Sequence, residues 1–139
     1  MPDNAKPRVL VVEDDDVTQT LFRRYLERSG FEVAVADNGL DAFAITAERP
    51  PDAVILDLMM PKMDGFGFLQ ALRASPAADL PVIVTSALAD AERKAQALAL
   101  GVKEYMVKTK FTLNELVDTV RRHMRQGSTS ATRKADPDL

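Results

Sequence analysis

Short apolar runs alternate with segments of helical spacing along most of the chain, and this alternation constrains the fold more than any other feature. Two runs, 9–12 and 53–56, are uninterrupted and too short for a helix, so each predicts a strand buried on both faces. Strands that alternate with helices are joined by right-handed crossovers into a parallel sheet. The predicted strands are 8–12, 32–36, 53–57, 81–85 and 104–107. The sequence therefore predicts an α/β fold with a five-stranded parallel sheet flanked by five helices.

The segments between the strands show the spacing and the end signals of helices. We expect each helix to begin at a side chain that can cap its free N–H groups. The expected starts are Asp16, Asn38, Asp64, Asp90 and Thr112, and the expected ends of the first four helices are Ser29, before Pro50, before Pro76 and Gly101. Asp16 with Gln19, and Thr112 with Glu115, resemble capping boxes. The residues expected to face the core are Val17, Leu21, Phe22, Tyr25 and Leu26, then Leu40, Phe43, Ala44 and Ala47, then Phe68, Leu69 and Leu72, and finally Leu113, Leu116, Val117, Val120 and Met124.

Length and composition limit the kind of protein this can be. A chain of 139 residues has the size of one domain with its own core. The 18 Lys and Arg against 21 Asp and Glu give a net charge of −3, which argues against nucleic-acid or anionic-membrane binding. The absence of cysteine excludes disulfides and thiolate metal sites. No apolar stretch approaches about 18 residues and no signal peptide is recognisable, so we expect a cytoplasmic protein that does not span a membrane.

The domain boundaries follow from where the periodic pattern begins and ends. We interpret residues 1–7 as a leader, 8–125 as the folded domain and 126–139 as a disordered tail. The tail is small, polar and charged, without an apolar period. If the chain were truncated, the tail would be the start of a linker.

Polar side chains stand at the ends of four predicted strands. Glu13 and Asp14 follow the first strand, Asp57 ends the third, Thr85 ends the fourth and Lys108 follows the fifth. In a parallel sheet these positions meet at one edge. Carboxylates and water are the ligands that Mg²⁺ prefers, with Mn²⁺ as an alternative, while a hydroxyl and an ammonium can neutralise a transferred phosphoryl group. The sequence therefore predicts a hard-cation site beside one reactive carboxylate, Asp57.

These motifs make the chain resemble the response-regulator receiver domain of two-component signalling, over roughly residues 8–125. The matching motifs are Glu13-Asp14, Asp57-Leu58-Met59-Met60-Pro61 with Asp64-Gly65, Thr85-Ser86-Ala87, and Lys108. The resemblance implies a flavodoxin-like fold with strand order 2-1-3-4-5. It also implies that Asp57 accepts a phosphoryl group from a histidine kinase or a phosphotransfer protein.

The resemblance further implies a role for each residue of the site. Asp14 and Asp57 would bind Mg²⁺ directly, Glu13 through water, and Met59 through its backbone carbonyl. Thr85 and Lys108 would bind the phosphoryl group, and Tyr105 would turn inward when Thr85 moves. Met59 and Ala87 would flank the path of the hydrolytic water and tune the lifetime of the acyl phosphate.

The turn after Lys108 departs from the family pattern, in which proline usually follows the lysine. Here the sequence is Lys108-Thr109-Lys110-Phe111. A cis bond before Thr109 would cost about 3–4 kcal/mol, so we expect a trans bond and a rebuilt turn before Thr112.

Three functions are open at this point. The first is a stand-alone phosphoacceptor switch, a monomer or weak homodimer without external substrate turnover. In such a switch, phosphorylation would change the affinity of one face for a protein partner. This face is formed by the fourth helix, the fifth strand and the fifth helix, and it carries the exposed residues Lys94, Lys103 and Lys110. The second is a phosphorylation-independent adaptor with the same fold. The third is an enzyme of the haloacid-dehalogenase type, which normally has a second Asp where Met59 stands. Uptake of phosphate from acetyl phosphate with Mg²⁺ would discriminate between the first two.

His123 is expected to be solvated and without a catalytic partner.

Overall fold

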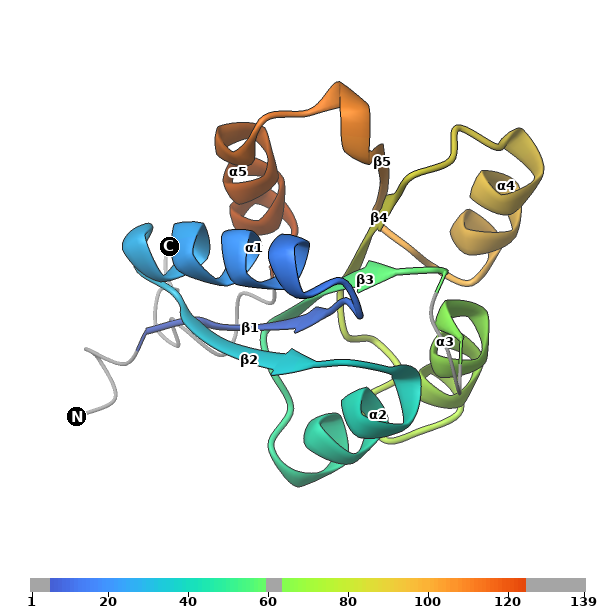
Figure 1. The fold of residues 1–139 in the computed structure, drawn as a ribbon. Coiled ribbons are helices and arrows are strands. Elements are labelled where there is room, and N and C mark those ends of the chain that lie inside the picture. Colours follow the sequence, from blue (N-terminus) through green and yellow to red (C-terminus); the bar gives the residue numbers. More distant parts are fainter. Residues whose placement is uncertain (1–5, 60–63, 125–139) are drawn as a thin grey trace, which may run out of the picture.

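A computed structural model describes residues 6–59 and 64–124, and the structural statements below concern those ranges. Five parallel strands form one sheet in the order β2-β1-β3-β4-β5, which confirms the expected fold and strand order (Figure 1). The strands are β1 Arg8–Val12, β2 Glu32–Ala36, β3 Ala53–Asp57, β4 Val82–Ser86 and β5 Glu104–Val107. The helices are α1 Asp16–Arg28, α2 Gly39–Glu48, α3 Gly65–Arg73, α4 Ala91–Ala99 and α5 Leu113–His123, with a short 3₁₀ turn, η2, at Lys108–Lys110.

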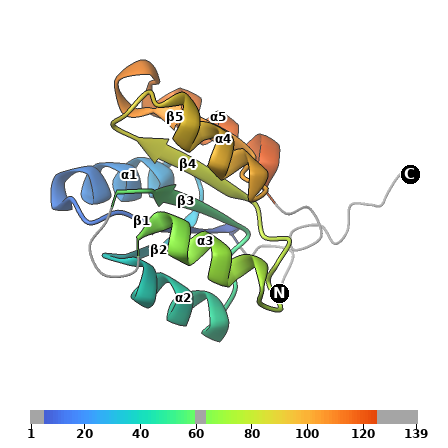
Figure 2. The same cartoon turned by 90° about the vertical axis from the view of Figure 1, so that its right-hand side faces the viewer.

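Helices cover both faces of the sheet. α1 and α5 lie on one face, and α2, α3 and α4 lie on the other (Figures 1 and 2). Alternate strand residues divide between two cores: Val9, Val11 and Ile55 pack towards α1 and α5, whereas Leu10 and Val54 pack towards the other helices. β3 and β4 are buried at every position, as uninterrupted apolar runs predict. The edge strands β2 and β5 are mostly half-buried.

Each helix begins at a capping side chain, as predicted, but the prediction for α1 was wrong by one residue. Its cap is Asp15, whose carboxylate accepts hydrogen bonds from Thr18 N at 2.8 Å and Thr18 Oγ1 at 2.7 Å. Asp16 is already helical, so it does not form a capping box with Gln19. The capping box of Thr112 and Glu115 is present at α5.

The predicted inward stripe of α1 was partly wrong. Phe22 and Leu26 are buried, but the side chains of Val17 and Leu21 are 76% and 50% exposed. Val17 and Leu21 are spaced by four residues and share one side of the helix, and Phe22 and Leu26 share another. Because Leu21 and Phe22 are adjacent in sequence, the two sides are about 100° apart around the helix axis.

The predicted stripe of α2 was also wrong in part. Leu40 is 54% exposed, and Ala44 and Ala47 are exposed, while Phe43 packs against the core. The buried positions include Ala42 and Thr46. Thr46 can face inward because its hydroxyl donates a hydrogen bond of 2.9 Å to the Ala42 carbonyl, so burial leaves no polar atom unsatisfied.

The stripes of α3 and α5 are confirmed. Phe68, Leu69 and Leu72 are fully buried, and Leu116, Val117 and Val120 are buried, with Leu113 and Met124 packed beside them. The first residue of α3 must be glycine, because a Cβ at Gly65 would lie 2.5 Å from Leu58 Cα. This close approach places the start of α3 directly against the loop that follows Asp57.

Two boundaries differ slightly from the predicted ones. β4 begins at Val82 rather than residue 81, because Pro81 has no N–H for the ladder and contributes only its carbonyl, which accepts from Val54 N at 2.9 Å. α4 ends at Ala99, and Gly101 follows with φ of +82°, the left-handed conformation that ends many helices.

The rebuilt turn after β5 is the 3₁₀ turn η2, and all peptide bonds of the described residues are trans, as expected for Thr109. His123, predicted to be solvated, is instead half-buried, and its Nε2 lies 3.0 Å from Glu104 Oε2. This contact joins the last residue of α5 to the first residue of β5.

Some predictions fall on residues outside the described ranges. These are residues 1–5 of the leader, 60–63 of the Asp57 loop, and the tail 126–139 with the preceding Arg125. None of the described helices is long and apolar enough to cross a membrane.

Candidate functional site

The predicted site residues meet at the carboxyl edge of the sheet. Asp57, the last residue of β3, lies opposite Thr85 of β4 in the strand register. β1 is the other neighbour of β3, with Val12 opposite Leu56, so Glu13 and Asp14 continue from β1 beside Asp57. The Glu13 N–H donates to the Ala36 carbonyl at 3.0 Å and fixes the backbone at this point. The parallel register therefore places three acidic residues and a threonine together.

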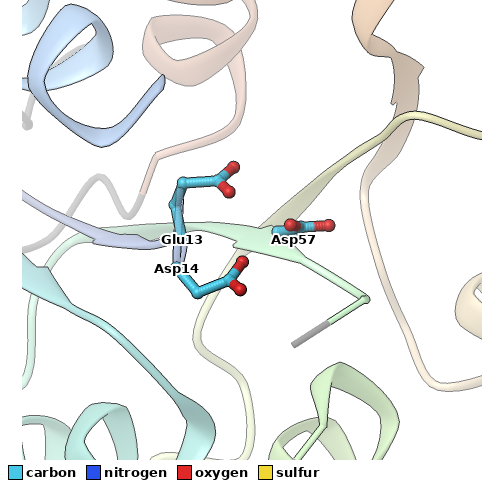
Figure 3. Close-up of side chains that lie close together, drawn as sticks. All are labelled: Glu13, Asp14 and Asp57. Atoms are coloured by element: carbon cyan, nitrogen blue, oxygen red, sulfur yellow. The ribbon is translucent and has the colours of Figure 1, made fainter. Parts of the chain in front are cut away.

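Three carboxylates form a cluster at this edge. One oxygen from each of Glu13, Asp14 and Asp57 lies within 4.8 Å of the others. Glu13 and Asp14 project from the end of β1 on the side of Asp57 (Figure 3). Glu13 is 2% and Asp57 5% exposed, whereas Asp14 is exposed. A set made only of oxygen donors with one side open to solvent fits a hard cation that keeps some of its water.

Lys108 brings a positive charge to this cluster. Its Nζ lies 2.7 Å from Glu13 Oε1 and 3.6 Å from Asp57 Oδ2. The turn η2 begins at Lys108, directly after β5, which aims the side chain back over the sheet edge. One ammonium therefore faces two buried carboxylates.

Burial and charge change the protonation equilibria of the ion pair. Burial raises the pKa of Glu13, and the charge of Asp57 adds to the rise, against the opposing hydrogen bonds from Lys108 and from Asp15 N. Burial alone would lower the pKa of Lys108, but its hydrogen bond to Glu13 and the charges of Glu13 and Asp57 raise it overall. Lys108 is thus held firmly in its charged form.

Thr85 presents a buried polar atom at the end of β4. Its side chain is 1% exposed, and Oγ1 has no hydrogen-bond partner among the described residues. Buried hydroxyls are usually hydrogen-bonded, since an unsatisfied one costs free energy. Its place beside Asp57 suits a site that receives a further group with oxygen atoms.

Met59 and Ala87 lie on the loops beside this site. The Met59 N–H donates a hydrogen bond of 3.1 Å to Asp57 Oδ1, and its side chain is 46% exposed. Ala87 follows β4 and is exposed. Met59 and Ala87 therefore follow the two neighbouring strands that end at Asp57 and Ser86, and their role in the lifetime of a phosphoryl group stays a prediction.

Tyr105 lies on the face formed by α4, β5 and α5. Its ring packs against the core, and its hydroxyl donates a hydrogen bond of 2.9 Å to the Leu88 carbonyl in the loop after β4. Lys94, Lys103 and Lys110 are exposed, as expected. The hydroxyl of Tyr105 thus connects β5 to the loop that follows Thr85.

Sequence reasoning missed two residues that organise the site. The Gln19 amide donates to the Glu13 carbonyl at 2.8 Å and to Asp37 Oδ1 at 2.9 Å, which ties the loops after β1 and β2 together. Arg93 in α4 reaches the Met59 side chain. Neither residue stands at a strand end, which is the pattern that predicted the other site residues. Gln19 could have been noticed because it follows the acidic residues after β1, whereas nothing in the sequence marks Arg93.

Comparison with known proteins finds a family model, curated relatives and solved structures that match this chain. A family model described as "Response regulator receiver domain" matches residues 9–121. The "Transcriptional regulatory protein PrrA" of Mycobacterium tuberculosis is 41% identical over 132 residues, which covers 95% of this chain and 56% of that protein. The chain spans about half the length of the curated relatives it matches. Because the name of this relative describes a transcriptional regulator, the expected absence of a nucleic-acid partner stays a prediction.

Solved structures show the same likeness. The receiver domain of the Francisella response regulator 1452 superposes with a TM-score of 0.77 and 33% identity, covering 84% of this chain and 94% of that one. The chemotaxis protein CheY4 of Vibrio cholerae gives a TM-score of 0.80 at 29% identity, with coverage of 86% and 99%. The likeness extends over nearly the whole described part of the chain.

Proposed function

The chain belongs to the response-regulator receiver family, and we propose on that premise that it is a phosphoacceptor switch in which Asp57 receives a phosphoryl group from a histidine kinase or a phosphotransfer protein. The observation that carries the proposal is the setting of Asp57. This buried carboxylate lies beside Glu13 and Asp14, within 3.6 Å of the Lys108 ammonium, and opposite the unsatisfied hydroxyl of Thr85.

The proposed reaction is a phosphoryl transfer between two side chains. An oxygen of the Asp57 carboxylate attacks phosphorus while the phosphorus–nitrogen bond of the donor phosphohistidine breaks. The ring nitrogen keeps the electron pair of that bond, and a mixed anhydride forms on Asp57. Such a transfer requires mainly positioning and neutralisation of charge. Lys108 is close enough to supply part of that neutralisation, since it already contacts the acceptor carboxylate.

Glu13, Asp14 and Asp57, with the backbone carbonyl of Met59, are the groups that would hold Mg²⁺ or Mn²⁺. The cluster of oxygen donors fits such a cation by its chemistry. When bound, the cation would neutralise charge on the phosphoryl oxygens. The residues themselves fix the position of the acceptor: the Met59 N–H holds one Asp57 oxygen, and Lys108 faces the other.

The output of the switch would start at Thr85. A phosphoryl oxygen would give the buried Thr85 hydroxyl the partner it lacks, and the loop after β4 would move with it. Tyr105, whose hydroxyl is bonded to Leu88 in that loop, would then release this bond and turn inward. The face of α4, β5 and α5, with exposed Lys94, Lys103 and Lys110, would thereby change its affinity for a protein partner.

Receiver domains are signalling switches rather than metabolic enzymes, and we propose no external substrate for this chain. Its proposed partners are a histidine kinase and one downstream protein, in the cytoplasm. The proposed assembly state is a monomer or a weak homodimer.

Phosphoryl uptake tests the proposal directly. The protein is incubated with acetyl phosphate or phosphoramidate, with and without Mg²⁺, and intact mass is measured. We expect the wild type to gain one phosphoryl group in the presence of Mg²⁺. The matched control is Asp57→Asn, which keeps the size of the side chain and is expected to gain none. No gain in the wild type, or an equal gain in the variant, would contradict the proposal.

A further inference from the structure

The side chains of Arg93 and Met59 meet at the edge of the sheet next to Asp57. Met59 stands two residues after Asp57, and Arg93 lies in the first turn of α4. Arg93 Nη1 lies 2.7 Å from Met59 Sδ. This contact joins the loop beside the proposed phosphoacceptor to the helix of the proposed output face.

Arg93 is fixed at its own end by the cap of α4. Its Nε lies 3.3 Å from Asp90 Oδ2, so the two residues form a salt bridge. The same Asp90 side chain caps the helix by accepting hydrogen bonds from Glu92 N and Arg93 N at 2.9 and 3.3 Å. The guanidinium is therefore oriented by the helix start rather than free to rotate in solvent.

Met59 is fixed at two points. Its backbone N–H donates to Asp57 Oδ1, and its sulfur meets Arg93. Since β4 is the neighbour of β3 and leads into α4, the Met59 side chain extends from the end of β3 towards the helix beyond β4. A methionine has three rotatable side-chain bonds and is otherwise flexible, so the contact with Arg93 restricts it to few conformations.

We propose that Arg93 is a positioning residue that holds Met59 across the approach to Asp57 and so prolongs the life of the acyl phosphate. This inference rests on the function proposed above. It also links α4 to the chemistry at Asp57: a partner that engages Arg93 would release Met59 and shorten the lifetime of the signal. A thioether is a weak acceptor, so the effect of this one contact is modest.

The first test follows loss of the phosphoryl group after removal of the donor, measured by intact mass. We expect Arg93→Gln to shorten the lifetime roughly threefold, which corresponds to a small change in barrier. Met59→Ala should have a similar effect, and Arg93→Gln should add nothing in the Met59→Ala background, because both changes remove the same contact. Glu92→Gln, an exposed change in the same turn, is the matched control and should leave the lifetime unchanged.

A second readout does not depend on phosphate. In the unphosphorylated protein, the Met59 methyl signal in NMR should shift towards the averaged position of a mobile methionine in Arg93→Gln, while Arg93→Lys should keep part of its dispersion. A wild-type lifetime in Arg93→Gln, an equal effect of that change in both Met59 backgrounds, or an unchanged Met59 methyl signal would overturn the inference. If the wild type gained no phosphoryl group, the proposed function would fail, and the methyl signal would still decide whether Arg93 fixes Met59.

Discussion

The Lys108 ammonium donates a hydrogen bond of 2.7 Å to the Glu13 carboxylate, although the two residues are 95 positions apart in the chain. Lys108 lies nearer to Glu13 than to Asp57, at 2.7 against 3.6 Å. Glu13 belongs to the proposed metal-binding group and Lys108 to the proposed phosphoryl-binding group. The two halves of the site are therefore joined by an ion pair, and a change at one half alters the charge balance of the other.

Loss of the lysine should destabilise the fold. Lys108→Met leaves the Glu13 carboxylate buried beside Asp57 without its partner, so the free energy of unfolding should fall by about 1–2 kcal/mol, less than for a fully buried pair because Lys108 still touches solvent. Urea denaturation measures the change. Lys110→Met, an exposed change in the same turn, is the control and should stay within about 0.5 kcal/mol. Equal stabilities of the two variants would show that the ion pair contributes nothing.

The same pair predicts how stability depends on alkaline pH. Folding raises the pKa of Lys108 above its ordinary value of 10.5. The contribution of the charged lysine to the free energy of unfolding is therefore complete below that pH. As pH rises further, unfolding releases a proton from Lys108, and stability declines until the folded pKa is passed. The stability difference between wild type and Lys108→Met should therefore be constant near neutral pH and shrink above about pH 10.5. Denaturation series across that range give the slope, and a difference that grows with pH would refute the assignment.

The carboxylate cluster predicts that removing one charge and adding a cation both stabilise the fold. Asp57→Asn relieves repulsion among three close carboxylates and should raise the free energy of unfolding by about 1 kcal/mol without Mg²⁺. Mg²⁺ at 100 times its dissociation constant should stabilise the wild type by about 2.7 kcal/mol, and chelation should reverse this. Thermal unfolding with Mg²⁺ or a chelator measures both effects. An equal Mg²⁺ effect in Asp57→Asn would place the cation elsewhere.

The grouping of the candidate site residues could be predicted from the sequence because most of them stand at strand ends. Apolar runs reveal where a buried strand stops, and a parallel sheet gathers those stops at one edge. Glu13, Asp57 and Lys108 meet for that reason. The strand order itself came from the resemblance to a known family, because apolar periodicity does not specify which strands are neighbours.

The contacts that modify the site could not be predicted in this way. Arg93 and Met59 are 34 positions apart, and neither their types nor their spacing mark a contact. The exposed Val17 and Leu40 show a second limit. Periodicity shows which residues of a helix are apolar, but the extent of the sheet beneath the helix decides which of them are buried. Both residues lie in the first turn of their helix, and Val17 is also rotated by about 100° from the buried row of α1.

The close packing at Gly65 predicts that a favourable helix substitution will destabilise this protein. Alanine is the better helix former by about 1 kcal/mol, but its Cβ would lie 2.5 Å from Leu58 Cα, a backbone atom that cannot move without shifting the Asp57 loop. We expect Gly65→Ala to lower the free energy of unfolding by about 2 kcal/mol. Gln70→Ala, at an exposed position of the same helix, isolates the effect of helix propensity and should be nearly neutral. A stabilised Gly65→Ala protein in urea denaturation would contradict the packing.

The unsatisfied hydroxyl of Thr85 predicts a conflict between stability and switching. Thr85→Val replaces a buried hydroxyl that has no partner among the described residues with a methyl group of similar size, so the free energy of unfolding should rise by about 1 kcal/mol. The variant should still accept a phosphoryl group on Asp57, because Thr85 does not contact the acceptor bond, but it should lose the proposed signal to Tyr105. Urea denaturation measures the first effect. The change in tyrosine fluorescence on phosphorylation measures the second, in a Tyr25→Phe background that leaves Tyr105 as the one tyrosine of the sequence. Thr85→Ser is the matched control, since it keeps the hydroxyl and should keep the fluorescence change. A destabilised Thr85→Val protein would mean that the hydroxyl already has a partner in the folded state, and the reason for its burial beside Asp57 would then be structural.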